Sequence, residues 1–272
     1  MNQDDGKPGT SGAGKATFVE WTPPSGREPR EIELVMAPAP RRAAVALVTG
    51  TSEGLGLALA TSLLAEGWIV HGFARGAQSL AHERFTAHGV DVTDESAVRV
   101  AVATVAEAGR IDLLVNNAGA ASLNSVLLTP GAVADALMRV NYLGTFHCLQ
   151  AVGKVMVRQR AGRIINLTTV AVPLSLEGEA AYVASKAAVE ALTKVAAKEL
   201  ATQGVRVVAL GLGPVDTRLT RAVPKAALAK INGAIGRPDG TSMEQAVDFI
   251  LARVNDTELR TGGVEYLGQI QT

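Results

Sequence analysis

Short apolar runs alternate with longer amphipathic stretches along most of the chain, from Ala43 to its end. The runs have the length of buried strands, and the stretches between them repeat their apolar residues at helical spacing. Such alternation predicts a parallel sheet with helices on both faces, because each crossover between parallel strands needs a long connection. We therefore expect an α/β fold, a single doubly wound domain of Rossmann type over residues 43–272, with about seven mainly parallel strands.

The apolar runs predict strands at 45–48, 69–73, 90–92, 113–116, 163–167, 205–210 and 264–267. The amphipathic stretches predict helices at 55–66, 95–108, 130–158, 181–202 and 243–255. The segment between the second and third strands is short, which leaves open whether it holds a helix. Ligands of such sheets bind beyond the carboxyl ends of the strands, so a site is expected at that edge.

Residues 1–42 form an N-terminal extension with a different composition. Residues 1–15 are rich in Gly, Ser and Asp, which predicts a disordered tail. Within 16–36, two short apolar groups flank the turn signal Pro-Pro-Ser-Gly at 23–26. This pattern is compatible with a hairpin or with an extended arm.

Composition excludes several classes of function. The chain of 272 residues has zero formal net charge and 47% apolar residues, which gives a sizeable core but no electrostatic footprint for nucleic acid. Its apolar runs are too short to span a bilayer, and residues 1–42 lack the apolar stretch of a secretory signal. The single cysteine, Cys148, lies in an apolar helical pattern and is expected in the core, so a reducing cytoplasmic location is the simplest interpretation.

A glycine-rich turn follows the first predicted strand and opens the first predicted helix. It reads Thr49-Gly50-Thr51-Ser52-Glu53-Gly54-Leu55-Gly56. Its glycines allow a tight turn and a close approach of the backbone to a diphosphate, and the helix N-terminus adds free N–H groups. The spacing Gly-x-x-x-Gly-x-Gly differs from the most familiar dinucleotide fingerprint.

Tyr182 and Lys186 are four residues apart, so both side chains emerge on one face of a predicted helix. A nearby positive charge favours the phenolate, which predicts a pKa of Tyr182 lowered toward neutrality. Such a tyrosine can give a proton to a carbonyl oxygen or take one from an alcohol. For an isolated pair at this spacing, the preferred interpretation is a packed tyrosine ring beside a solvated lysine.

Four motifs in register resemble the short-chain dehydrogenase/reductase family, and in particular its ketoreductases. They are the turn at 49–56, Asn116-Asn117-Ala118-Gly119, Asn141 in Val-Asn-Tyr-Leu-Gly-Thr, and Tyr182-x-x-x-Lys186. Their order and spacing agree from about Ala43 to the end of the chain. The resemblance implies a Rossmann fold, a nicotinamide cofactor and no metal.

The resemblance also implies which residues contact the cofactor. Asn117, Ala118 and Gly119 would leave room for the adenosine ribose and pyrophosphate, and Asp91 would meet the adenine, although Asp91 is equally suited to cap a helix. The complete implied set is Gly50, Ser52, Glu53, Gly54, Leu55, Gly56, Ala74, Arg75, Asp91, Val92, Asn117, Ala118, Gly119, Tyr182, Lys186, Gly213, Pro214, Val215 and Thr217.

The end of the second strand indicates which cofactor is used. NAD enzymes of this kind place an acid there for the ribose 2′-hydroxyl, whereas NADP enzymes remove it and add a base for the 2′-phosphate. Here Ala74 takes the place of the acid, and Arg75 follows as a phosphate ligand. Glu53 argues weakly for NAD, but the pattern favours NADP(H) over NAD(H).

The implied catalytic set is Asn141, Thr169, Tyr182 and Lys186. Asn141 would hold a water in a distorted helical turn and link Lys186 to a proton relay, while Lys186 would also bind the nicotinamide ribose. Thr169 stands where the family usually has serine; it keeps the hydroxyl and adds a methyl group. Two further departures, Val208 and Leu212, concern the support of the carboxamide-binding segment.

These residues predict the NADPH-dependent reduction of a ketone, or the reverse oxidation of a secondary alcohol, with Tyr182 as general acid or base. The alternative is a catalytically silent NADP-binding sensor or scaffold, although such proteins commonly lose the tyrosine or the lysine. An enoyl reductase is disfavoured by the close Tyr–Lys spacing. A structural role could reside in residues 1–42.

The substrate loop is expected at about 217–237, helped by 173–178. The apolar residues of these two segments indicate a bulky apolar, polyketide-like small molecule, although their helical spacing also fits ordinary packing. They are Leu174, Leu176, Leu219, Val223, Leu228 and Ile231. The family usually pairs the helices at 130–158 and 181–202 across a two-fold axis, which predicts a homodimer or homotetramer. No nucleic acid or membrane partner is expected.

Overall fold

The structure is a computed structural model that describes residues 17–19, 31–33, 42–217, 220 and 223–269. It divides into two units, Met1–Arg42 and Ala43–Thr272. In the first unit, β1 (Thr17–Val19) pairs antiparallel with β2 (Glu31–Glu33), so the strand pairing of a hairpin is present there. The predicted tail at 1–15 lies outside the described residues.

The second unit is built on a seven-stranded sheet in the order β5-β4-β3-β6-β7-β8-β9, and every neighbouring pair is parallel. Its strands are β3 (Val45–Thr49), β4 (Ile69–Ala74), β5 (Phe85–Gly89), β6 (Leu113–Asn116), β7 (Gly162–Thr169), β8 (Val205–Leu212) and β9 (Val264–Tyr266). The predicted doubly wound α/β fold is therefore confirmed.

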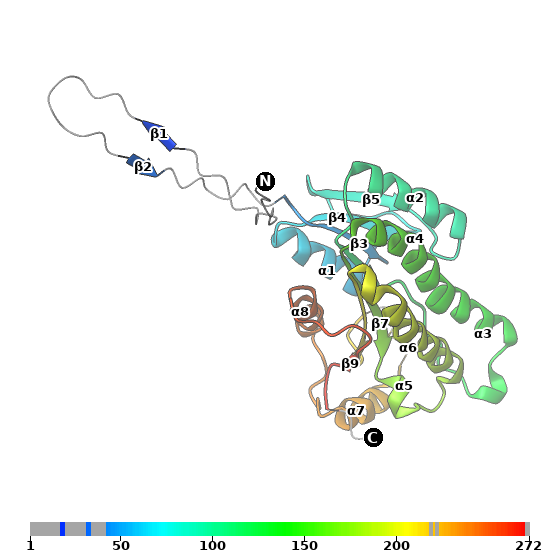
Figure 1. Ribbon diagram of the computed structural model, residues 1–272. Helices are drawn as coiled ribbons and strands as arrows, with labels where there is room; N and C mark the ends of the chain where they lie inside the picture. The colour runs from blue at the N-terminus through cyan, green and yellow to red at the C-terminus, as the bar shows by residue number, and fades with distance from the viewer. Residues whose placement is uncertain (1–16, 20–30, 34–41, 218–219, 221–222, 270–272) are drawn as a thin grey trace, which may run out of the picture. The chain divides into compact units, whose positions relative to one another are not determined.

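Helices cover both faces of the sheet (Figure 1). On one face, α2 (Glu95–Ala108), α4 (Gly144–Gln159) and α6 (Ala180–Leu200) share an apolar core with β3, β4, β6 and β7. On the other face, α1 (Gly54–Ala65) packs with α8 (Met243–Val254) over the alternate side chains of the same strands. Because β3 and β6 are buried on both faces, they read in the sequence as continuous apolar runs.

Local signals fix where several helices begin. The Asp94 carboxylate accepts from the Ala97 amide and caps α2, and Ser242 and Gln245 form a reciprocal capping box on α8. Helix α1 follows the glycine-rich turn directly, where Gly50 and Gly54 have φ values of +77° and +59°. A residue with a β-carbon is disfavoured in that region, so these two positions favour glycine.

One strand prediction was wrong, and two helices were not predicted. The third strand is β5, at Phe85–Gly89, and not the run at 90–92, whose valines instead pack into the core. The reason is that β5 is an edge strand with mostly exposed side chains and lacks an apolar run. Residues 75–84 contain no helix, whereas two helices were not anticipated as such, α5 (Ala171–Leu174) and α7 (Lys225–Ala234).

The helix predicted over 130–158 contains a π turn. It is formed by α3 (Gly131–Leu137), the π-helical Met138–Leu143, and α4. Asn141 lies within this turn, so the distorted helical geometry expected around it is present. Such turns occur frequently at functional sites.

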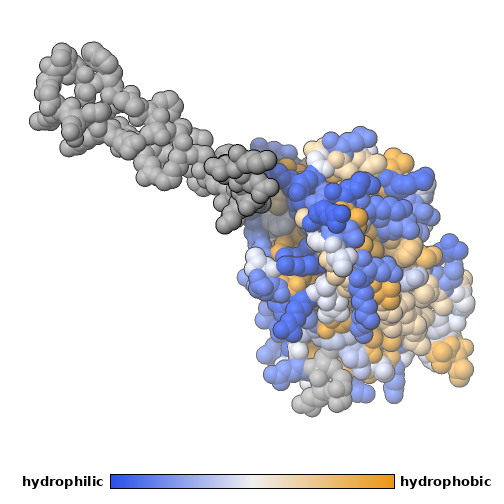
Figure 2. Space-filling model, viewed as in Figure 1, coloured by the Kyte–Doolittle hydropathy of each residue, from blue (hydrophilic) through white to orange (hydrophobic). Residues whose placement is uncertain are grey.

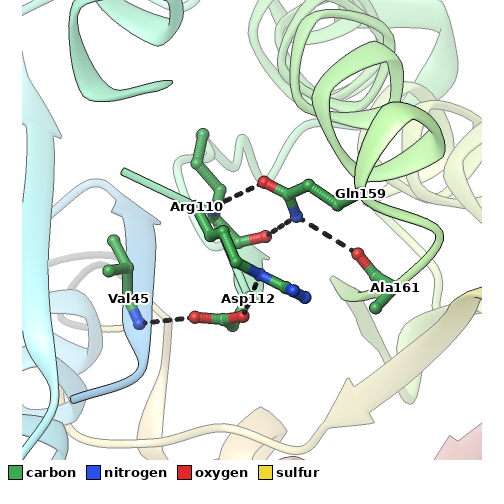
Figure 3. A network of polar contacts seen from close by, with 6 residues as sticks. Val45, Arg110, Asp112, Gln159 and Ala161 are labelled. Atoms are coloured by element: carbon green, nitrogen blue, oxygen red, sulfur yellow. Dashed lines mark hydrogen bonds and ion pairs between the residues drawn. The ribbon is translucent and has the colours of Figure 1, made fainter. Parts of the chain in front are cut away.

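The edge of the sheet where the strands begin is fastened by polar side chains (Figure 3). Asp112 accepts from the Val45 amide at 3.0 Å and pairs with Arg110 at 3.4 Å, which ties β3 to β6. Gln159 bonds both the amide and the carbonyl of Ile111, at 3.0 and 2.8 Å. These side chains therefore stabilise the end of the sheet that lies opposite the carboxyl ends of the strands.

Two expectations from composition can be compared with the fold. Cys148 is fully buried in the core, and burial raises the pKa of its thiol to about 12, so its predicted core position is confirmed. None of the helices in the described part of the chain combines the length and the apolarity that are needed to cross a bilayer.

Candidate active site

A cleft of about 1060 Å³ opens at the carboxyl ends of the strands. This is the edge at which sheets of this topology bind ligands, and the volume suits a cofactor together with a substrate. The sequence-predicted residues that line it are Gly50, Ser52, Glu53, Gly54, Leu55, Gly56, Ala74, Arg75, Asp91, Val92, Asn117, Ala118, Gly119, Thr169, Tyr182, Lys186, Gly213, Pro214, Val215 and Thr217. The structure thus brings nearly the whole predicted set to one cleft.

The glycine-rich turn is packed so closely that larger residues do not fit. A β-carbon at Gly56 would lie 2.2 Å from the Gly50 carbonyl oxygen, and one at Gly50 would lie 2.8 Å from the amide nitrogen of the Asn117 side chain. Asn117 donates to the Thr49 carbonyl at 2.7 Å, while the Thr49 hydroxyl oxygen accepts from the Asn117 and Ala118 amides. Asn117 therefore shapes the turn from behind, a role that sequence spacing alone did not indicate.

One end of the cleft carries the residues that distinguish the two nicotinamide dinucleotides. Ala74 ends β4 as a buried residue, and the exposed Arg75 follows it at the cleft wall. Asp91 accepts from the amide and the hydroxyl of Thr93, both at 2.9 Å. Since Asp94 supplies the cap of α2, Asp91 is not its helix cap. The lining at this end suits a dinucleotide with a 2′-phosphate, because it offers a guanidinium where an acid would repel that group.

Thr169 and Tyr182 meet in the cleft. Thr169 is the last residue of β7 and Tyr182 lies in the first turn of α6; both are buried, and hydrogen bonding by the Thr169 hydroxyl acts to lower the pKa of Tyr182, against the larger effect of burial, which raises it. The Thr169 oxygen also accepts from the Ala171 amide at 3.2 Å. Two hydroxyl groups that can face one carbonyl oxygen therefore lie side by side.

Lys186 is 6% exposed and its ammonium donates to the Leu167 carbonyl at 2.9 Å. Burial lowers the pKa of Lys186 to about 8. The pKa of Tyr182 is raised to about 12, chiefly by burial, so the lowered value expected from the sequence is wrong for this structure. The physical reason is that desolvation of the phenol outweighs the attraction of a lysine that points at the β7 backbone.

Asn141 is fully buried outside the cleft lining and acts as a clamp. The Oδ1 atom of its side chain accepts from the Ala120 backbone amide at 2.8 Å. Its Nδ2 atom donates to the Ala120 backbone carbonyl and to the Ser185 hydroxyl, both at 2.9 Å. A β-carbon on Gly119 would lie 3.1 Å from Asn141 and 3.5 Å from Lys186, so a side chain there would crowd both. The backbone carbonyl of Asn141 accepts from the Thr145 hydroxyl at 2.7 Å.

The segment after β8 closes another side of the cleft. Gly213, Pro214, Val215 and Thr217 line it, and the Thr217 amide donates to the Thr220 hydroxyl at 3.2 Å. Of the two departures, Leu212 lines the cleft and Val208 is buried in the core on the α1 and α8 face of the sheet.

The substrate half of the cleft is mostly apolar. Leu176, Val223, Leu228 and Ile231 line it as predicted, whereas Leu174 packs behind it and Leu219 lies outside the described residues. Sequence reasoning missed Glu179, a half-buried carboxylate of the cleft wall without a hydrogen-bonded side-chain partner among the described residues. Burial raises the pKa of Glu179. Its place three residues before Tyr182, on the same helix face, was the available signal.

Comparison with known proteins gives three kinds of match. A family model described as short chain dehydrogenase matches residues 44–227. A 3-oxoacyl-(acyl-carrier-protein) reductase FabG of Staphylococcus epidermidis is 37% identical over 192 residues, which are 65% of this chain and 78% of the relative. The FabG reductase of Salmonella typhimurium is 33% identical over 187 residues, 66% of this chain and 76% of the relative.

Solved structures match over most of the second unit. ElxO with NADP bound has a TM-score of 0.76 and 26% identity, and the match covers 82% of this chain and 96% of ElxO. A short chain dehydrogenase from Burkholderia cenocepacia in complex with NADP has a TM-score of 0.72 and 32% identity, covering 83% of this chain and 88% of the other.

Proposed function

This chain belongs to the short-chain dehydrogenase family, and on that premise we propose that it reduces a ketone with NADPH, or oxidises the matching secondary alcohol. The observation that carries the proposal is the buried Thr169–Tyr182 hydroxyl pair in the cleft, with the ammonium of Lys186 held beneath it by the β7 backbone. Relatives that match the chain are reductases of 3-oxoacyl groups, and structures that match it contain NADP.

The chain's own residues supply the proton chemistry. When bound, NADPH provides the hydride that reduces the carbonyl carbon. The Thr169 hydroxyl donates a hydrogen bond to the carbonyl oxygen, and the Tyr182 hydroxyl gives that oxygen its proton. With its pKa raised to about 12, the phenol of Tyr182 is protonated near pH 7, which is the form that gives a proton to the carbonyl oxygen in the reduction. Lys186 would orient the ribose of the cofactor. It would also return a proton to the Tyr182 phenol, along a path that passes Asn141 and Ser185.

NADP(H) is the cofactor that the cleft suits. Gly50, Gly54 and Gly56 let the backbone of the turn come close to a diphosphate at the N-terminus of α1, where phosphate groups are stabilised. Arg75 would hold the 2′-phosphate, and Ala74 removes the acid that would repel it.

The substrate is a small molecule whose chemistry the cleft restricts. Apolar lining from Leu176, Val223, Leu228 and Ile231 favours a bulky apolar ketone, such as a polyketide-like or fatty acyl chain. Glu179 is the carboxylate of the substrate half, so it disfavours a substrate with its own carboxylate beside the ketone and favours one that offers a hydroxyl or an amide N–H.

We also propose that the enzyme acts as a homodimer or homotetramer through α4 and α6. Apolar side chains lie over these helices on the face shown in Figure 2, and Val195 on α6 is 54% exposed. The cytoplasmic location expected from the single cysteine stays a prediction.

The test is the loss of nicotinamide absorbance with a panel of ketones, including a 3-oxoacyl thioester and bulky cyclic ketones. The wild type is expected to oxidise NADPH with at least one of them, and Tyr182→Phe is expected to be inactive while still binding NADPH. Full activity in Tyr182→Phe would refute the mechanism. Tight binding of NADPH without turnover of any ketone would instead support a silent sensor or scaffold.

A further inference from the structure

A buried carboxylate outside the cleft, Glu190 on α6, joins three elements that build the site. We propose that Glu190 is a positioning residue that fixes the end of β7 behind Thr169 and connects it to the α7 wall of the substrate half. The inference rests on the proposed function, because it assigns a role in the same reaction.

Glu190 is held by two hydrogen bonds to a single oxygen. It is 7% exposed, and its Oε1 accepts from the Thr168 hydroxyl and from the Tyr266 hydroxyl, each at 2.8 Å. It lies on the same face of α6 as Tyr182 and Lys186, one turn beyond the lysine. A carboxylate in such a place is unfavourable unless its hydrogen bonds repay the loss of water, so the two hydroxyls are integral to it.

The bond to Thr168 controls the orientation of its neighbour. Successive side chains of a strand point to opposite sides, so Thr168 faces α6 while Thr169 faces the cleft. With Thr168 tied to the helix that carries Tyr182, the backbone at the end of β7 cannot rotate independently of that helix. The distance between the Thr169 and Tyr182 hydroxyls is thereby fixed from behind.

The bond to Tyr266 extends the connection to the substrate. The ring of Tyr266, at the end of β9, lies against Gly211, where a β-carbon would approach it to 2.2 Å. It also packs against a small apolar cluster that contains Val170, Ile231 of α7, and Ile235, the residue that follows α7. Because Ile231 lines the cleft, displacement of Tyr266 would move the substrate wall.

A second buried pair provides a matched comparison within the same helix. Thr193 accepts from the Asn166 side chain at 2.8 Å, and Asn166 in turn accepts from Asn116 at 2.8 Å. These groups join the same helix to the same strand and are as deeply buried, but they lie one helical turn further from the cleft. Removing the bond between Asn166 and Thr193 should lower the thermal stability without changing kcat or KM.

The experiment compares Glu190→Leu, Glu190→Gln, Thr168→Val, Tyr266→Phe and the control Thr193→Val in the full-length enzyme. Thermal unfolding, NADPH binding, kcat, KM for the ketone and the pH profile of kcat/KM are measured for each. We expect Thr168→Val and Glu190→Leu to lower kcat by about 10-fold or more, since a displacement near 1 Å can cost about 100-fold. Tyr266→Phe should chiefly raise the KM for the ketone. Glu190→Gln, unlike Glu190→Leu, should keep the wild-type activity, because an amide oxygen also accepts both hydrogen bonds.

NADPH binding should stay unchanged throughout, and Thr193→Val should lose thermal stability but keep kcat and KM. The proposal is overturned if Thr168→Val and Glu190→Leu keep wild-type kcat, or if Thr193→Val loses as much activity as they do at equal loss of stability. A shifted pH profile in Glu190→Gln would also overturn it, because the charge and not the bonds would then act. Should the wild type itself turn over no ketone, it is the proposed function that fails.

Discussion

Replacing Lys186 by methionine should make the folded protein more stable while abolishing its activity. The lysine is buried, and its pKa of about 8 lies below the ordinary value of 10.5 because burial disfavours the charged form. Each pH unit between the two values is worth about 1.4 kcal/mol, so the charged ammonium costs the folded state about 3 kcal/mol at pH 7. Methionine has a similar length without charge, and the lost bond to the Leu167 carbonyl costs about 1–2 kcal/mol. The net gain is about 1–2 kcal/mol.

The gain should depend on pH in a defined direction. Below pH 8 the lysine is charged in both states and its full cost is present. Between pH 8 and 10.5 only the unfolded chain holds the proton, so the wild type gains stability as the pH rises and Lys186→Met does not. Tyr182 affects the stability in a different pH range. Because its pKa is raised, its contribution to the stability of the fold is fully present below pH 10 and is lost as the pH rises through about 12.

The assay is urea unfolding of both proteins at equal concentration from pH 7 to pH 9.5, alongside NADPH oxidation with the active ketone. Lys194→Met, at an exposed position of the same helix, is the control and should show no such pH-dependent difference. The reasoning is refuted if Lys186→Met is less stable than the wild type at pH 7, or if the difference between them stays constant up to pH 9.5.

Substitutions at three further positions test separate parts of the site and the sheet. Thr169→Val removes the hydroxyl at nearly constant volume and should lower kcat by about 10²–10³, whereas Thr169→Ser should keep most of the activity; equal rates for valine and serine would exclude a role for the hydroxyl. Arg75→Ala should raise the KM for NADPH by about 10- to 100-fold and leave that for NADH nearly unchanged, which steady-state kinetics with both cofactors measures. The ring nitrogens of His71 and His88 form a hydrogen bond of 3.0 Å between β4 and β5, and burial lowers the pKa of His71 to about 4. The stabilising contribution of neutral His71 is therefore present above pH 6.5 and is lost as the pH falls toward 4. Thermal unfolding of the wild type and His71→Gln from pH 7.5 to 4.5 should show a steeper fall for the wild type, and parallel curves would contradict the assignment.

The sequence predicted those elements whose position is set by burial on both faces. β3 and β6 are fully buried, so their continuous apolar runs predicted strands directly. The turn between β3 and α1 needs positive φ angles, and its glycines indicate this in the sequence. In contrast, β5 is an edge strand with mostly exposed side chains, and the valines that follow it have a stronger apolar pattern. Edge pairing depends on the neighbouring strand, which a local pattern does not contain.

Most of the candidate site lay within short motifs and was therefore visible before the fold. What remained hidden depends on pairs that are distant in sequence. Glu190 and Tyr266 are 76 residues apart, and Asn141 and Ser185 are 44 apart. Likewise, the pKa of Tyr182 depends on how completely the fold removes water from the phenol, and the spacing to Lys186 does not report this.

The π turn at Met138–Leu143 can be regarded as a single added residue in what would otherwise be one continuous α-helix. Removing any one residue from it would restore regular helical pairing and turn α3 by roughly 100° about its axis relative to α4. The side chain at 141 would then leave Ala120 and Ser185, and the loop beside Gly119 would lose its anchor. A one-residue deletion here should therefore lower the activity far more than a substitution at any solvent-facing position of the same helix.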